Sequence, residues 1–233
     1  MTRRRKEHLH RIYDRLLNEF GPQHWWPAQT EFEVIVGAIL TQNTAWKNVE
    51  TSIALLRQNG ILSFEGIHEL EVEQLAPLIR SSGYYNQKAK KLKEFCRHLA
   101  SHWQGDLAAF LSQEMEALRS ELLTIRGIGP ETADSIVLYA GYHPSFVVDR
   151  YTHRIFSRHN WVYEDLGYEE LRSYFMDSLE PDVPFYREFH GLLVRTGHLF
   201  CRKKPLCNSC PLNGWTEEEA SPLTESSRAG SPD

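Results

Sequence analysis

The first stretch of this sequence that could do chemistry is a short turn around residue 128. Gly127 and Gly129 flank the apolar Ile128, and Pro130 stands where a helix can begin, because the first helical residue needs no N–H. Glycines let the backbone turn tightly and approach another molecule closely. Such a turn presents main-chain amides at a helix N-terminus, where hydrogen bonding and the helix dipole both favour an anion. The pattern is typical of a plain connection between two helices, and an anion site is the other interpretation.

The cysteines form a second candidate group. Cys201, Cys207 and Cys210 crowd into ten residues, while Cys96 stands alone. Four cysteines in this arrangement do not make a disulfide framework. The spacing favours a reduced, intracellular protein with a metal site near its C-terminal end.

Tryptophans form the third group. Trp25, Trp26 and Pro27 are consecutive, and Trp46 follows twenty residues after Trp26. Adjacent tryptophans can line a flat slot, and their electron-rich faces attract a cation. Packing inside a core is the other interpretation of these residues.

The elements that would position these residues are helices almost throughout. Apolar residues recur at helical spacing over 9–20, 32–40, 133–140 and 185–200. Phe146, Val147 and Val148 are the one candidate strand, and they have no second strand to pair with. No apolar run reaches the length of a membrane span, and the basic start of the chain does not lead into a secretory signal. We expect an all-α protein of about ten helices.

The net charge of −5 understates the basic character of the chain. Residues 211–233 carry a net charge of −4, which leaves −1 for residues 1–210. Basic residues cluster at 3–6, 88–93 and 202–204. Local patches of this kind, and not the total charge, determine the field that a phosphate backbone meets.

Several blocks in order resemble one protein family. Gly-Ile-Gly-Pro-Glu-Thr-Ala-Asp is followed by Asp149, eighteen residues after Glu131, and is preceded by FEVIVGAILTQNT at 32–44 and SGYYNQKAKK at 82–91. These blocks resemble the helix-hairpin-helix (HhH-GPD) base-excision glycosylases of the endonuclease III superfamily. The resemblance covers residues 7–212 and is closest to the 3-methyladenine DNA glycosylase branch.

The resemblance implies a two-lobed helical fold with the active site in a cleft between the lobes. Residues 27–140 would form a helical barrel lobe ending in the hairpin, and 1–26 with 141–212 a second lobe carrying the cysteine loop; 213–233 would be a disordered acidic tail. The hairpin residues that would bind double-stranded DNA are Gly127, Ile128, Gly129 and Thr132. The enzyme would swing a damaged nucleotide out of the stack. Gln42 would fill the space in the DNA stack that the displaced nucleotide leaves. The other interpretation of Gln42 is an ordinary polar residue at a helix end.

The hairpin helix also indicates the chemistry. Relatives of the lyase type carry a lysine where this chain has Glu131, and a carboxylate cannot form the imine that lyase chemistry needs. We therefore expect a monofunctional glycosylase in which Asp149 stabilises the oxocarbenium-like sugar or activates water. Asp149 could also cap a helix beginning at Arg150. The alternatives are an endonuclease III-type glycosylase/lyase for oxidised pyrimidines and a non-catalytic helix-hairpin-helix DNA-binding protein.

The base pocket that the resemblance implies contains Trp25, Trp26, Pro27, Trp46, Glu131 and His198. The tryptophan element and Trp46 resemble the 3-methyladenine branch, which also has a glutamate in place of the lysine. We therefore expect the substrate to be a damaged, alkylated purine such as 3-methyladenine, because alkylation at a ring nitrogen makes the base a cation that aromatic faces attract and weakens its bond to the sugar. Some members of that branch bring basic residues from the late helix to the pocket, and here the corresponding positions are Leu192 and His198. An adenine-mismatch glycosylase is disfavoured because Ala38 stands at the position of its catalytic glutamate.

Cys201, Cys207 and Cys210 resemble the iron–sulfur loop of endonuclease III, normally C-x6-C-x2-C-x5-C. Here the first spacing is one residue shorter, and Trp215 and Thr216 stand where the fourth cysteine belongs. A [4Fe–4S] cluster with an unusual fourth ligand, a zinc site and a metal-free loop remain open, and the chemistry requires no cofactor. We expect a monomer in the cytoplasm, associated with the nucleoid if bacterial, whose partner is duplex DNA containing a damaged base and not a membrane.

Overall fold

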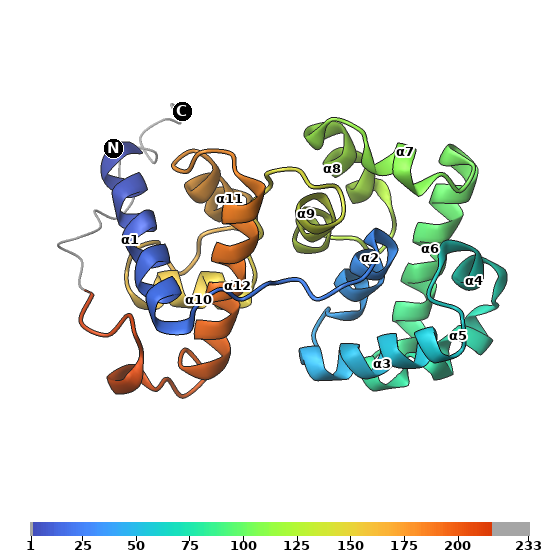
Figure 1. Ribbon diagram of the computed structural model, residues 1–233, viewed down its shortest axis with the longest axis horizontal. Helices are drawn as coiled ribbons and strands as arrows, with labels where there is room; N and C mark the ends of the chain where they lie inside the picture. The colour runs from blue at the N-terminus through green and yellow to red at the C-terminus, as the bar shows by residue number, and fades with distance from the viewer. Residues whose placement is uncertain (1, 216–233) are drawn as a thin grey trace, which may run out of the picture. The chain divides into compact units, whose positions relative to one another are not determined.

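The computed structural model describes residues 2–215 of the 233-residue chain. In this part of the chain twelve α-helices and two short 3-10 helices form, and no strand is present (Figure 1). The chain divides into two compact units. The first contains the residues up to Trp25 and those from Phe146 onwards, and the second is Trp26–Ser145.

The second unit carries the hairpin and contains nine helical elements. They are α2 (Glu31–Leu40), α3 (Trp46–Gln58), α4 (Phe64–Glu69), α5 (Val72–Leu78), η1 (Arg80–Ser82), α6 (Tyr85–Trp103), α7 (Leu107–Leu111), α8 (Met115–Thr124) and α9 (Pro130–Tyr139). The hairpin helix α9 packs against α2 and α8, and α6 packs against α4 and α5 (Figure 1). Both α2 and α9 are buried over nearly their whole length, which makes them the centre of this unit.

A buried ion pair joins the two helices of the hairpin. Arg119 of α8 donates through Nε and Nη2 to the two carboxylate oxygens of Asp134 of α9, at 2.8 and 3.1 Å. The hydroxyl of Ser145 donates to the same carboxylate at 2.5 Å. A buried carboxylate needs such partners because an unpaired charge away from water is strongly unfavourable. The pair therefore holds α8 and α9 in one arrangement on either side of the turn.

The first unit contains α1 (Thr2–Phe20), α10 (Arg150–Arg158), α11 (Tyr168–Met176), α12 (Val183–Leu199) and η2 (Cys207–Ser209). Helix α12 packs against α10 and α1 (Figure 1). The core is aromatic: Phe146 stacks on Phe175 with ring centroids 4.0 Å apart, and both lie near Phe189. This packing explains why residues 146–148 are buried without forming a strand.

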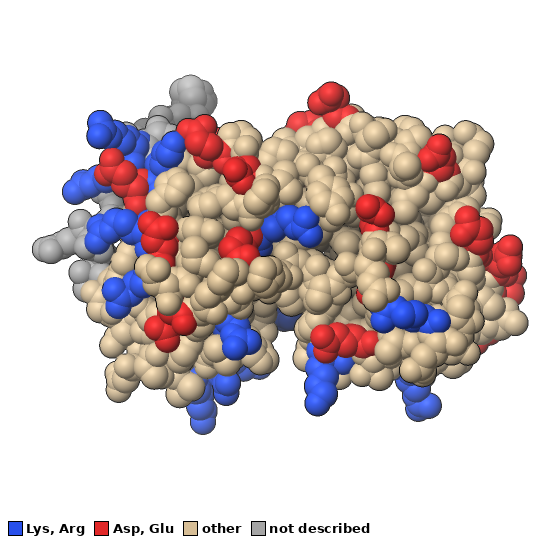
Figure 2. Space-filling view, in the orientation of Figure 1, with Lys and Arg blue, Asp and Glu red and all other residues tan. Residues whose placement is uncertain are grey.

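Acidic side chains partly neutralise the basic start of α1. Figure 2 shows Lys and Arg gathered over α1 with Asp and Glu among them. Arg3 pairs with Glu7 at 3.1 Å, and Lys6 pairs with Glu180 at 2.6 Å. Exposed pairs of this kind contribute little to stability, but they reduce the charge that the patch at 3–6 offers to a phosphate.

The structure confirms the all-α prediction and several helix ends. Helix α8 ends at Thr124, α9 begins at Pro130 and α10 begins at Arg150. Short helices α4, α5 and α7 have five to seven residues, too few to reveal a helical period, which is why the sequence predicts fewer helices. The prediction of a disordered tail is wrong for residues 213–215, because 213 and 214 belong to a turn and Trp215 packs near His8 and Trp161; the rest of the predicted tail, from 216 onwards, lies outside the described residues. Within residues 2–215, no helix has the length and apolar character needed to cross a membrane.

Candidate DNA-binding hairpin and active site

The turn between α8 and α9 has the backbone geometry that its glycines suggested. Gly127 has φ +96°, a conformation that favours glycine, whereas Gly129 has φ −99° and precedes the first turn of α9. Ile128 is buried and anchors the turn. No side chain caps α9, so the first-turn amides keep their capacity to bind an anion. A Cβ added at Gly129 would meet no atom within 4 Å, so this face of the turn is open to a ligand.

Lys91 of α6 packs across the same turn. A Cβ at Gly127 would lie 2.5 Å from Cγ of Lys91 and 3.1 Å from its Cε. Gly127 is therefore required both by its positive φ and by the close approach of this side chain. The packing brings a cationic side chain beside the turn, an arrangement that the sequence alone did not indicate.

Gln42, in the loop after α2, is bound to the hairpin. Its amide nitrogen donates to the carbonyl of Gly127 at 3.2 Å and to the hydroxyl of Thr132 at 3.0 Å. Its amide oxygen accepts a hydrogen bond from the ammonium of Lys91. The structure thus brings together the predicted DNA-binding residues Gln42, Gly127 and Thr132. Filling a gap in DNA remains a prediction for Gln42, which would have to leave these partners to do so.

Lys88 fixes the start of the same loop. Its buried ammonium donates to the carbonyl of Leu40, at the end of α2, at 2.8 Å and to that of Ser82 at 2.6 Å. Burial lowers the pKa of Lys88 to about 8, and the nearby charge of Lys91 acts in the same direction. The basic cluster at 88–93 therefore includes a lysine that positions backbone inside the unit, whereas Lys90 of the same cluster is exposed.

Asp149 caps α10 in the first unit. One carboxylate oxygen, Oδ1, accepts from the main-chain N–H of Thr152 at 2.7 Å and from its hydroxyl at 2.9 Å. The other oxygen, Oδ2, lies 4.0 Å from Nε2 of His190 on α12. Burial lowers the pKa of His190, and the charge of Asp149 opposes this shift. The cap fixes the orientation of the carboxylate and leaves Oδ2 outside it, an arrangement compatible with both roles considered for Asp149.

The tryptophans occupy different surroundings. Trp26 is 7% exposed, lies edge-on to Trp46 with centroids 4.9 Å apart, and also contacts Tyr139. Trp46 is half-buried, and its indole N–H donates to Glu50 at 2.9 Å. Trp25 belongs to the first unit, where Gly191 of α12 leaves room for it: a Cβ there would lie 2.8 Å from Cβ of Trp25. The structure therefore pairs Trp26 with Trp46 and adds Tyr139, which the sequence did not single out.

The remaining residues of the predicted base pocket are at the surface or in the core. Pro27 is exposed, Glu131 is exposed in the first turn of α9, and His198 is exposed in the last turn of α12. Leu192 is fully buried among the core residues of the first unit. Glu131 is the acidic residue in the first turn of α9.

The cysteine loop does not fit a four-thiolate cluster. Among the described residues, no group of three or more His, Cys, Asp or Glu is placed to hold a metal ion. Trp215, at the position expected for a fourth ligand, instead packs near His8 and Trp161. Cys207 is exposed, and burial raises the pKa of the Cys210 thiol, which favours its protonated form.

These features identify the class of protein. Residues 36–181 match the family model described as "HhH-GPD superfamily base excision DNA repair protein". The chain belongs to this family, because the match covers more than half of it. It is a base excision repair DNA glycosylase of the HhH-GPD superfamily.

Individual relatives agree with this assignment. The chain is 44% identical over 213 residues to "Putative DNA repair glycosylase MJ1434" of Methanocaldococcus jannaschii, covering 91% of this chain and 97% of that protein. It is 31% identical over 188 residues to endonuclease III of Thermotoga maritima, covering 80% and 82%. The crystal structure of H. pylori 3-methyladenine DNA glycosylase bound to 1,N6-ethenoadenine is 29% identical, with a TM-score of 0.72 over 83% of this chain and 97% of that one. A non-covalent complex of endonuclease III with DNA has the same fold, with 22% identity and a TM-score of 0.76.

Proposed function

We propose that the protein is a monofunctional DNA glycosylase that hydrolyses the N-glycosidic bond of an alkylated purine, such as 3-methyladenine, in double-stranded DNA. The hairpin binds the phosphate backbone through its open amides, and the enzyme acts as a monomer without a cofactor. The observation that carries the proposal is the exposed carboxylate of Glu131 at the start of α9. It occupies the position where the lyase-type relatives, by resemblance, hold their amine nucleophile.

Asp149 is the catalytic carboxylate in this proposal. Cleavage of a glycosidic bond develops positive charge on the sugar, which a fixed carboxylate stabilises electrostatically. Because the cap engages Oδ1, we assign this task to Oδ2. A purine made cationic by alkylation is already a good leaving group, so the site needs little general acid catalysis.

In this proposal the ring of Trp46 contacts the damaged base, and Trp26 supports the ring of Trp46. Trp26 is too buried to offer an open face, whereas Trp46 is only half-buried and is supported edge-on by Trp26. Aromatic faces favour a cationic ring over a neutral one. The similarity to a 3-methyladenine glycosylase bound to a modified adenine supports an alkylated purine as the substrate.

The deciding experiment incubates the purified protein with methylated genomic DNA and identifies the released bases by chromatography. Release of 3-methyladenine with intact abasic sites in the product is the expected result. A strand broken at the abasic site, trapped by borohydride as a covalent adduct, would instead support the endonuclease III-type alternative that the Thermotoga maritima relative suggests. The variant Lys91→Met would then show whether the amine beside Gly127 is the nucleophile. Duplex binding without release of any base would leave only the DNA-binding role.

A further inference from the structure

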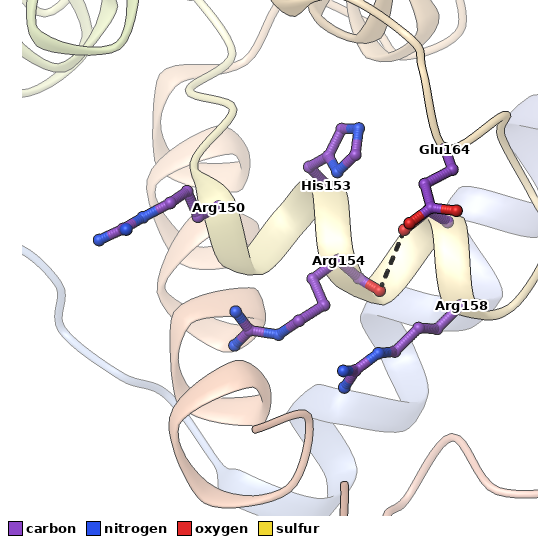
Figure 3. Close-up of a pocket in the computed structure, with 6 residues that line it drawn as sticks. Arg150, His153, Arg154, Arg158 and Glu164 are labelled. Atoms are coloured by element: carbon purple, nitrogen blue, oxygen red, sulfur yellow. Dashed lines mark hydrogen bonds between the residues drawn. The ribbon is translucent and has the colours of Figure 1, made fainter. Parts of the chain in front are cut away.

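A pocket lies along α10 in the first unit. It has a volume of about 460 Å³ and is open to solvent (Figure 3). Five of its six lining residues come from one face of α10, and Glu164 comes from the segment that follows the helix; the six are Arg150, His153, Arg154, Ser157, Arg158 and Glu164.

Three arginines line the pocket at regular intervals along α10. Arg150, Arg154 and Arg158 recur every four residues, so they form a row on one side of α10. Four helical residues rise about 6 Å, and the row therefore extends about 12 Å along the helix axis. In Figure 3, Arg154 and Arg158 extend in the same direction, and Arg150 lies farther towards the start of the helix.

Backbone carbonyls of the cysteine loop hold two of these arginines in place. Arg154 donates through Nε to the carbonyl of Cys201 at 2.6 Å. Arg158 donates through Nη1 to the carbonyl of Arg202 at 2.6 Å and through Nη2 to that of Lys203 at 3.3 Å. Neutral carbonyls orient a guanidinium without cancelling its charge. The Nη groups of Arg154 make no hydrogen bond to a described residue, so they remain available to an anion.

The charge of the pocket is predominantly positive. Arg150 makes no ion pair or hydrogen bond with the described residues, and Glu164, the one carboxylate of the lining, is not paired with any arginine there. The lining therefore contains three guanidinium groups and one carboxylate. The exposed basic segment at 202–204 lies beside them, because its own carbonyls bind Arg158. Guanidinium groups with free donors bind phosphate oxygens well.

We propose that this pocket binds backbone phosphates of the DNA strand, as a second phosphate site separate from the hairpin. Successive phosphates of one strand advance about 3.4 Å along a duplex, so the arginine row spans about three to four of them. The row begins at Arg150, directly after Asp149 at the cap of α10. A strand bound along it is therefore held at the end of the helix that carries the proposed catalytic carboxylate. The inference rests on the proposed function only in assigning the bound phosphates to a DNA strand.

The test measures binding to a short undamaged duplex, which requires no base release. We compare wild type with Arg150→Gln, Glu164→Gln and the control Arg3→Gln, whose side chain is exposed on α1 of the same unit. At salt concentrations between about 50 and 200 mM, Arg150→Gln should bind the duplex several-fold more weakly than wild type. The slope of the logarithm of the binding constant against the logarithm of the salt concentration should be smaller by about 0.9 for each phosphate that the variant no longer neutralises. Glu164→Gln should tighten binding, and Arg3→Gln should leave it unchanged.

Two further measurements distinguish the source of the phosphate. Inorganic phosphate or a deoxynucleoside monophosphate should compete only weakly with the duplex, because a row of arginines binds a strand at several points. Strong competition by the free nucleotide would overturn the assignment to DNA. An unchanged salt slope in Arg150→Gln, or no tightening in Glu164→Gln, would overturn the phosphate site itself. If wild type binds duplex but releases no alkylated base, the proposed function is wrong. The salt slopes would still show whether the pocket binds the phosphates of the duplex.

Discussion

Asp149 and His190 face each other across α10 and α12, with Oδ2 of the carboxylate 4.0 Å from Nε2 of the buried imidazole. The other carboxylate oxygen caps α10 through Thr152. Because desolvation lowers the pKa of His190, the imidazole is neutral near pH 7 and does not compensate the charge of Asp149. A carboxylate that the imidazole does not compensate can stabilise a cationic transition state, which leads to the first two predictions.

Replacing Asp149 separates capping from catalysis. Asparagine caps helices about as well as aspartate, so Asp149→Asn should stay folded, whereas Asp149→Ala should lose about 0.5–2 kcal/mol of stability with the cap. Both variants lack the charge, and we expect each to lose roughly 100-fold or more in single-turnover base release. Thermal unfolding and duplex binding provide the controls. If Asp149→Asn kept a rate near that of wild type, Asp149 would be a cap alone.

His190 should make the protein less stable in mild acid. Its folded pKa lies below the ordinary value of 6.5, so below that pH the unfolded chain binds more protons than the folded one. The free energy of unfolding should therefore fall as pH drops from about 6.5 towards the folded pKa. Urea unfolding at pH 7.5 and pH 5 should show a smaller loss in His190→Asn than in wild type. His159, whose pKa burial also lowers, contributes in both proteins. Equal losses in the two proteins would contradict the assignment to His190.

The two hairpin glycines should respond differently to alanine. Gly127→Ala combines a positive φ with a Cβ placed 2.5 Å from Cγ of Lys91, so we expect a loss of about 1–3 kcal/mol. Gly129→Ala has an ordinary φ and free space, so its thermal unfolding should match that of wild type. Its added methyl lies where a phosphate would approach, and duplex binding should weaken. A Gly129→Ala protein with full affinity would show that DNA does not approach this face.

The sequence predicted the hairpin well because its signals are local. A proline at the first helical position and an acid at a cap act within one turn of chain, and Pro130 and Asp149 stand at the predicted helix starts. Interactions between distant segments were not predictable in the same way. Lys91 reaches Gln42 and Gly127 through packing of α6, and periodicity cannot show which lysine of a basic cluster points inward. The same reason explains why His190 was missed.

The cysteine loop should keep its structure without metal. Arg154 and Arg158 of α10 bind three of its carbonyls, and Arg158 also donates to Sγ of Cys201 at 3.4 Å. These bonds tie the loop to α10 without a fourth thiolate. Arg158→Gln should therefore increase hydrogen exchange over residues 201–210, whereas Arg150→Gln, on the same helix but without a bond to the loop, should not. Protein purified anaerobically should show no absorbance near 400 nm, and treatment with a chelator should leave the exchange pattern unchanged. A coloured protein whose loop loosens on chelation would mean that a cluster, and not the arginines, holds the loop.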